Sequence, residues 1–196
     1  MAFLRSTQET GLPVTGRNVM LRAPSVFDYA AWSHVRGESA AHLQPWEPSW
    51  AADELSRSSY RRRLRQYARD LAGDTGYPMF VVSHGTGQLL GGITLSNVRR
   101  GVAQAASVGY WVGARFAGQG VMSDALDALI PFAFEHLRLH RLEAACLPHN
   151  AASIRVLEKS GFLREGVARR YLKINGSWQD HVLFALTEDD RRGDRS

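Results

Sequence analysis

The chain has 196 residues, of which 44% are hydrophobic and 22% charged, and 24 basic against 19 acidic residues give it a net charge of +5. Length and composition are those of a globular protein with one domain over residues 1–196, whose ordered core we expect at about 17–188 between frayed termini. No run reaches the roughly 18 apolar residues of a membrane span, and no secretory signal opens the chain, so we expect a cytoplasmic protein without a membrane partner. A single cysteine argues against a disulfide, and scattered histidines argue against a metal site.

The first part of the chain predicts a strand, a helix and a stiff loop. Residues 19–22 have the pattern of a strand, and Ser25 with Asp28 has the spacing of a capped helix start, with the helix reaching about Arg36. Two prolines then bracket Trp46 and Glu47. Because proline fixes its own φ and biases the residue before it away from helix, we expect residues 42–48 to form a rigid loop.

An arginine-rich segment at residues 53–71 predicts a basic helix. Leu64, Tyr67, Ala68 and Leu71 would form its buried face. Its solvent-exposed face would carry the arginines, which are Arg57, Arg61, Arg62, Arg63, Arg65 and Arg69. A solvated helix face is the simpler explanation of this pattern. Docking on an acidic or RNA-bearing partner is the alternative, and such contacts would be sensitive to salt. The sequence establishes no direct nucleic-acid site.

The remaining chain alternates strands and helices. Turn residues at 85–87 and at Asn175-Gly176 predict two hairpins, and Pro131 should kink or end the helix that contains it. We expect strands at 79–83, 89–96, 105–112, 141–147, 167–174 and 177–186, and helices from residue 121 and at 151–160. This order predicts one mixed α/β domain.

The stretch 110–125 runs from a strand through a glycine-containing turn into a helix. A helix start leaves backbone N–H groups without partners at a partly positive end, which suits a phosphate. Gly118 and Gly120 remove side chains that would hold an anion away, and Arg115 adds a fixed charge. A turn that merely needs positive φ explains the glycines equally well. Neither of the standard phosphate-binding loops, the Walker motif or the three-glycine dinucleotide motif, is present.

The spacing Arg115-x-x-Gly118-x-Gly120 after a strand resembles the acetyl-CoA signature of the GCN5-related N-acetyltransferases. Further segments resemble the RimJ/RimL group of that superfamily, which acetylates N-terminal alanine of ribosomal proteins. The matching segments are residues 43–48, 109–112, 115–120, 140–141, 148–153, 158–162 and 175–181.

The resemblance implies a mixed, mostly antiparallel sheet with splayed central strands, flanked by helices. It implies acetyl-CoA as cosubstrate, a protein or peptide N-terminus as acceptor, possible homodimers, and no metal. The pantetheine arm would pair with the backbone of the strand as an added strand would, and the pyrophosphate would lie on the amides of the turn beside Arg115. The cofactor-binding residues are then Tyr110, Trp111, Val112, Arg115, Gly118, Gln119, Gly120, Val121, Met122, Asn150 and Ser153.

Asn150 and Ser153 stand at the start of the helix 151–160. Asparagine is a favoured helix N-cap, and a serine in the first turn needs no special role. The resemblance implies that Asn150 also holds the pantetheine amide and that Ser153 lies near the thioester sulfur. Ser153 is therefore a candidate catalytic residue that donates a proton to the leaving thiolate.

The acceptor must lose a proton before it can attack. An α-amino group has a pKa near 7.7 to 8.0, so roughly a tenth is neutral at pH 7, against less than about a thousandth of a lysine. An N-terminal acceptor therefore needs only a weak base or a water relay. Glu47 is the candidate base, and a structural carboxylate is the equal alternative. Trp46 and Asn97 are candidate substrate-binding residues, with core packing and turn formation as alternatives.

Cys146 does not suit a covalent mechanism, because no neighbouring cation in its apolar strand would lower its pKa. Two functions compete with transfer to a protein N-terminus. The first is acetylation of a small amine or antibiotic, which would favour an acidic pocket. The second is a non-catalytic CoA-binding or RNA-associated module, against which the intact cofactor motif argues.

Overall fold

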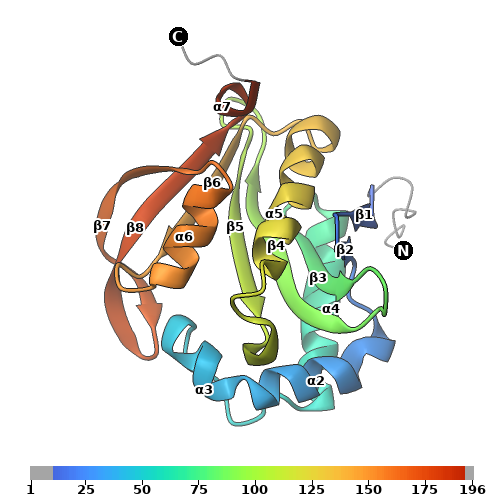
Figure 1. Cartoon of the computed structure of the whole chain (residues 1–196). Coiled ribbons are helices and arrows are strands. Elements are labelled where there is room, and N and C mark those ends of the chain that lie inside the picture. Colours follow the sequence, from blue (N-terminus) through green and yellow to red (C-terminus); the bar gives the residue numbers. More distant parts are fainter. Residues whose placement is uncertain (1–10, 193–196) are drawn as a thin grey trace.

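The computed structural model describes residues 11–192 as one sheet covered by helices on both faces (Figure 1). The order of the strands across the sheet is β1-β2-β3-β4-β5-β6-β8-β7. Their bounds are β1 Val14–Thr15, β2 Val19–Arg22, β3 Tyr77–Ser83, β4 Leu89–Arg99, β5 Ala105–Val112, β6 Arg141–Cys146, β7 Leu163–Ile174 and β8 Ser177–Thr187. Neighbouring strands are antiparallel except β5 and β6, which are parallel. The mostly antiparallel α/β fold expected from the sequence is confirmed.

The helices divide between the two faces. Figure 1 shows α5 and α6 in front of the sheet, α4 behind it, and α2 and α3 along its lower end. The helical segments are η1 Val26–Asp28, α2 Tyr29–Glu38, α3 Ala40–Leu43, η2 Gln44–Trp46, α4 Arg57–Ala72, η3 Ala114–Phe116, α5 Val121–Pro131, the single π-type turn η4 Phe132–His136, α6 Ala151–Lys159 and α7 Glu188–Arg192.

Strand alternation assigns β5 side chains to two different cores. Val108 belongs to the large core under α5 and α6, and Tyr110 packs against the same core. Trp111 packs against a smaller core that includes Trp32 and Tyr60, from α2 and α4. Successive residues of a strand point to opposite faces, so these three residues place β5 between the two layers.

The two middle strands separate soon after they begin to pair. β5 and β6 are in register only from Ala105 opposite Arg141 to Ser107 opposite Glu143. Beyond these residues β5 continues to Val112 beside β4, and β6 continues to Cys146 beside β8. The splayed central strands expected from the resemblance are therefore present, and Figure 1 shows α6 and α5 in front of the sheet with β5 visible between them.

Three local expectations need correction or refinement. α4 begins at Arg57, where Ser56 caps it by accepting a hydrogen bond from the Ser59 amide. Its fully buried residue is Tyr60, whereas Ala68 is exposed, because the small methyl lies on the side turned from the sheet. The rigid loop expected at residues 42–48 is partly helical: Pro45 occupies the first turn of η2, where its missing N–H costs nothing.

Pro131 ends α5, as expected for a residue that cannot complete the helical hydrogen-bond pattern. The chain continues through η4, where the amide of Leu137 donates to the carbonyl of Phe132 over 3.0 Å. The described structure extends past the expected core at both ends, to β1 and α7. The remaining terminal residues, expected to be frayed, lie outside the described part of the chain.

Candidate active site

The turn between β5 and α5 presents an open, glycine-lined backbone. Gly118 has φ +75° and Gly120 has φ +78°, both in the left-handed region that favours glycine. A Cβ added at either position would meet no atom of the described chain within 4 Å. Gly120 immediately precedes α5, so the unpaired amides of the first helical turn lie next to this open volume. The glycines thus leave room for a ligand on the N–H side of the turn.

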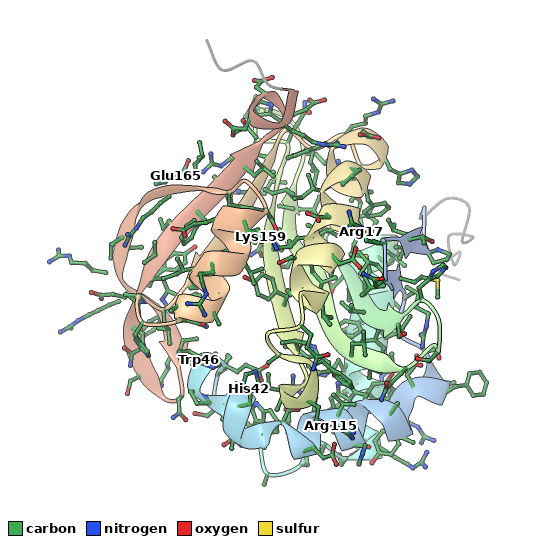
Figure 2. The ribbon with its side chains drawn as sticks, viewed as in Figure 1. Arg17, His42, Trp46, Arg115, Lys159 and Glu165 are labelled. Atoms are coloured by element: carbon green, nitrogen blue, oxygen red, sulfur yellow. The ribbon has the colours of Figure 1, made fainter. Side chains whose placement is uncertain are left out.

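Side chains and neighbouring segments hold this turn in place. Ser39 Oγ, between α2 and α3, accepts a hydrogen bond of 2.9 Å from the Ala114 amide, and Gln119 Nε2 donates to the Arg115 carbonyl over 2.7 Å. The Arg115 side chain is 70% exposed and makes only a 3.9 Å contact with Glu38. Figure 2 shows Arg115 at the base of the turn. An exposed cation beside open amides fits a diphosphate group.

A hydrogen bond joins β5 to α6 in front of the gap between the splayed strands. The Tyr110 hydroxyl lies 2.7 Å from Ser153 Oγ and 3.3 Å from the Ser153 carbonyl oxygen. Burial raises the pKa of Tyr110 to about 12, and the bond to Ser153 opposes part of that shift. The phenol is therefore protonated at neutral pH and can donate to Ser153, which leaves the serine hydrogen free for another acceptor.

Asn150 caps α6 as its residue type suggests. Its Oδ1 accepts a hydrogen bond of 3.1 Å from the Ser153 amide, so the cap fixes the backbone that carries the serine. The ring of His149 lies 5.4 Å from the ring of Trp46, with the planes tilted by 44°. This contact brings η2 to the start of α6, and Figure 2 shows Trp46 and His42 below that helix.

Cys146 is the last residue of β6 and is buried. Burial raises the pKa of its thiol to about 11, although the neighbouring Ser153 hydroxyl lowers it in part. The thiolate is the reactive form, so this cysteine is a poor nucleophile at neutral pH. The environment agrees with the interpretation of Cys146 as a small core residue.

The carboxylate of Glu47 is held by three hydrogen bonds. Arg36 donates from both terminal nitrogens, at 3.1 and 2.6 Å, and Trp50 Nε1 donates over 2.7 Å. The Arg36 side chain is only 6% exposed, and its guanidinium lies over the rings of Trp50, at 4.6 Å, and Trp111, at 5.1 Å. This buried cation binds the carboxylate that the sequence offers as a base, so the geometry favours the structural alternative for Glu47.

Asn97 lies near the end of β4 and has a left-handed φ of +50°. Its Nδ2 lies 3.5 Å from Ser107 Oγ, at the point where β5 and β6 cease to pair. Both residues line a hollow of about 620 Å³ that also includes Tyr67, Glu143 and Tyr171. The structure therefore separates the two candidate substrate-binding residues: Trp46 lies by the start of α6, and Asn97 lies in this hollow.

Sequence reasoning missed the side-chain role of Tyr110, which it treated only as backbone, and missed Arg36 altogether. Alternation along β5 puts Tyr110 on the face of Val108, under the helices, and this signal could have located the phenol. Nothing local in the sequence marks Arg36 as the partner of Glu47. Among residues 11–192, no group of three or more His, Cys, Asp or Glu side chains could hold a metal ion. Within the same residues, no helix is long and apolar enough to span a membrane.

The sequence of the chain matches a known enzyme family. Residues 18–163 match the family model of an acetyltransferase (GNAT) domain. The [Ribosomal protein uS5]-alanine N-acetyltransferase of Escherichia coli is 34% identical over 167 residues, which are 84% of this chain and 86% of that protein.

Two solved structures are similar throughout. RimJ of Mycobacterium smegmatis in complex with CoA-disulfide has a TM-score of 0.87 and 32% identity, covering 92% of this chain and 90% of that one. The ribosomal-protein-S5-alanine acetyltransferase of Vibrio fischeri has a TM-score of 0.84 and 30% identity, covering 91% and 98%.

Proposed function

The chain belongs to the GNAT acetyltransferase family and is an N-acetyltransferase of the RimJ/RimL type, and we propose that it acetylates the N-terminal α-amine of a ribosomal protein that begins with alanine. The observation that carries the proposal is the Tyr110–Ser153 hydrogen bond of 2.7 Å, which links β5 to α6 beside the gap in the sheet. The names of the E. coli and V. fischeri relatives support alanine as the acceptor. A ribosomal-protein substrate would also place the enzyme in the cytoplasm.

Acetyl-CoA would supply an acetyl group already activated as a thioester. We propose that the amides of residues 118–122 and the Arg115 side chain bind its pyrophosphate, since the turn leaves that volume open. The β6-facing backbone edge of β5 at residues 110–112 is the proposed seat of the pantetheine arm, because β6 has separated from it there. Asn150 would contribute its amide nitrogen while its oxygen caps α6.

Ser153 is the proposed proton donor. As the acceptor nitrogen forms its bond to the acetyl carbon and releases one proton to water, the carbon–sulfur bond breaks and its electron pair goes to sulfur, which takes the serine proton. Tyr110, protonated because of its burial, donates to Ser153 Oγ and so both orients the serine and can restore its proton. Direct transfer of this kind needs both substrates bound at once.

The acceptor requires little help to lose its proton. A tenth or so of an α-amine is neutral at pH 7, so water can serve as the base. We propose that Glu47 anchors the segment before α4 through Arg36 and Trp50, and that Trp46 then borders the peptide. Asn97 is proposed to bind the peptide backbone in the hollow that it shares with Tyr171.

The test is a comparison of acceptors with the purified enzyme and acetyl-CoA. A peptide that begins with alanine should gain one acetyl group on its α-nitrogen, as located by tandem mass spectrometry. The same peptide with a blocked N-terminus and an internal lysine should gain none. Faster turnover of spermidine or an aminoglycoside than of the free peptide would contradict the proposal.

A further inference from the structure

One flank of α4 carries four arginines at intervals of one helical turn. Arg57, Arg61, Arg65 and Arg69 are all exposed, and together they are called the arginine stripe. With a rise of 1.5 Å per residue, successive members lie about 6 Å apart along the axis and the stripe spans about 18 Å. The site described above uses none of these residues.

The carboxylates of residues 11–192 form ion pairs with other arginines of α4 but not with the stripe. Arg62 and Arg63, on the same helix, make ion pairs of 2.6 Å with Asp53 and 2.5 Å with Glu54. Within residues 11–192, no carboxylate lies within 4 Å of a guanidinium nitrogen of the stripe. Arg57 instead lies over the ring of Tyr29, at 4.4 Å, and Arg69 donates to the side-chain oxygen of Gln66. Among the described residues the stripe therefore has no ion-pair partner, and its charge is open to an anionic ligand.

An exposed aromatic ring lies at the beginning of the stripe. Phe27 is 92% exposed in the short turn η1. Contacts on both sides hold that turn against α4: the Tyr60 hydroxyl donates to the Ser25 carbonyl over 2.7 Å, and Arg57 covers Tyr29. Val26, beside it, is 63% exposed, so the turn presents an apolar pair to solvent rather than a single ring.

We propose that the arginine stripe and Phe27 form a docking surface for single-stranded RNA. A polynucleotide offers one negative charge per residue along its length, which suits guanidinium groups at regular intervals, and every base offers a face that can stack on an aromatic ring. An acidic protein would also be attracted by the charge, but its carboxylates would not stack on the exposed ring of Phe27, whereas a base can. The exposed residues between the arginines are Ser58, Arg62, Gln66 and Ala68, so they offer no large apolar centre for a protein interface.

The helix that carries the stripe, α4, lies behind the sheet, whereas α6, which carries Ser153, and α5, which follows the glycine turn, lie in front of it (Figure 1). RNA and acetyl-CoA can therefore bind at the same time. Such a surface would hold the enzyme on an RNA-containing particle while the acetyl-transfer site remains accessible. The inference does not rest on the identity of the acceptor peptide, and RNA binding can be measured without any acetyl transfer.

The test is fluorescence anisotropy of a labelled 12-nucleotide RNA with the full chain over a range of salt concentrations. Each phosphate contact adds about −0.7 to the slope of log affinity against log salt for single strands. Replacing Arg61, Arg65 and Arg69 by Gln should therefore make that slope shallower by about 2. Phe27→Ala should weaken binding about 5- to 140-fold at one salt concentration with the slope unchanged, since stacking involves no charge.

Arg62→Gln is the matched control, because Asp53 already neutralises Arg62, and its affinity should stay within about twofold of wild type. All variants should keep their melting temperatures and their turnover of a short peptide. No binding at low salt, or an unchanged slope in the triple variant, would overturn the proposal. Equal affinity for polyglutamate would assign the surface to an acidic protein instead, and displacement of the RNA by acetyl-CoA would assign the RNA to the acetyl-transfer face. Either result would also refute it, while intact peptide turnover would leave the acetyltransferase assignment standing.

Discussion

Ser153→Ala separates the structural and chemical roles of the serine. The substitution removes the 2.7 Å hydrogen bond to Tyr110, but the phenol keeps a second acceptor in the Ser153 carbonyl oxygen at 3.3 Å. The cap from Asn150 to the Ser153 amide uses only backbone on the serine side and survives. The loss of stability should therefore be about 1 kcal/mol, which lowers the melting temperature of a domain of this size by about 2 to 4 °C.

Turnover should fall much further than stability. A positioned general acid contributes about 10²-fold or more, equivalent to about 2.7 kcal/mol of barrier. The CoA thiol has a pKa near 8.5, so its thiolate is a fair leaving group and water can replace part of the contribution of the serine. We therefore expect turnover to fall by about 10²-fold, the lower end of the range for a general acid. The dissociation constant for acetyl-CoA should stay within about twofold, because the lost hydroxyl is not one of the proposed pyrophosphate contacts.

Tyr110→Phe provides the second arm of a double-mutant cycle. One hydrogen bond of about 0.5 to 1.5 kcal/mol corresponds to a decrease in kcat of about 2- to 13-fold. If Tyr110 acts through Ser153, the double variant should be no slower than Ser153→Ala alone. Steady-state rates on an alanine-initiated peptide and calorimetric titration of acetyl-CoA provide the measurements. Wild-type turnover in Ser153→Ala, or a decrease in kcat of the double variant equal to the product of the two single decreases, would refute the proposal that Tyr110 acts through Ser153.

Gly120→Val should abolish acetyl-CoA binding with an unchanged circular dichroism spectrum, because a branched side chain would fill the open volume and resist a φ of +78°. Gly87→Val, equally strained in the β3–β4 turn, should bind acetyl-CoA normally. Near-normal affinity in Gly120→Val would contradict the proposal that the glycine turn binds the pyrophosphate. Cys146→Ala should keep most of its turnover. Below pH 9 the Cys146 thiol is protonated in the folded and the unfolded protein, and between pH 9 and about 11 it ionises only in the unfolded protein. The free energy of unfolding of the wild type, measured by urea titration, should therefore fall with rising pH more steeply than that of Cys146→Ala. Glu47→Gln should cost about 3 kcal/mol of stability, because it leaves Arg36 buried with no carboxylate closer than Glu54 at 4.0 Å. The control Glu38→Gln should cost little. Intact stability of Glu47→Gln with about 10²-fold lower turnover would support Glu47 as the base instead.

Local sequence patterns located the elements that carry the site because each has a short-range cause. The Asn175-Gly176 turn is a hairpin because both residues adopt positive φ, at 42° and 81°, and the pairing of β7 with β8 follows from it. The strand–turn–helix unit from β5 to α5 is likewise set by alternation, two glycines and then helical periodicity. These features depend on neighbours a few residues apart, so they can be read without a fold.

The remaining features of the site depend on contacts between distant segments. Tyr110 and Ser153 are 43 residues apart, and only the separation of β5 from β6 brings the phenol to α6. Arg36 is a similar case: on a helix surface it would be a solvated charge, but the packing of Trp50 and Trp111 around it turns it into the anchor of Glu47. Burial of Tyr60 rather than Ala68 also depends on which flank of α4 meets the sheet.

The short pairing of β5 with β6 has a consequence for the backbone itself. From Val108 onward β5 is bonded on its β4 side, while the amides that point toward β6 lie at an internal edge of the sheet. Such protons can exchange with solvent without global unfolding, whereas those in the β3–β4 and β6–β8 ladders exchange only when the sheet opens. An extended ligand lying along this edge would complete the ladder, and deuterium uptake at residues 108–112 would then report its arrival directly, one amide at a time.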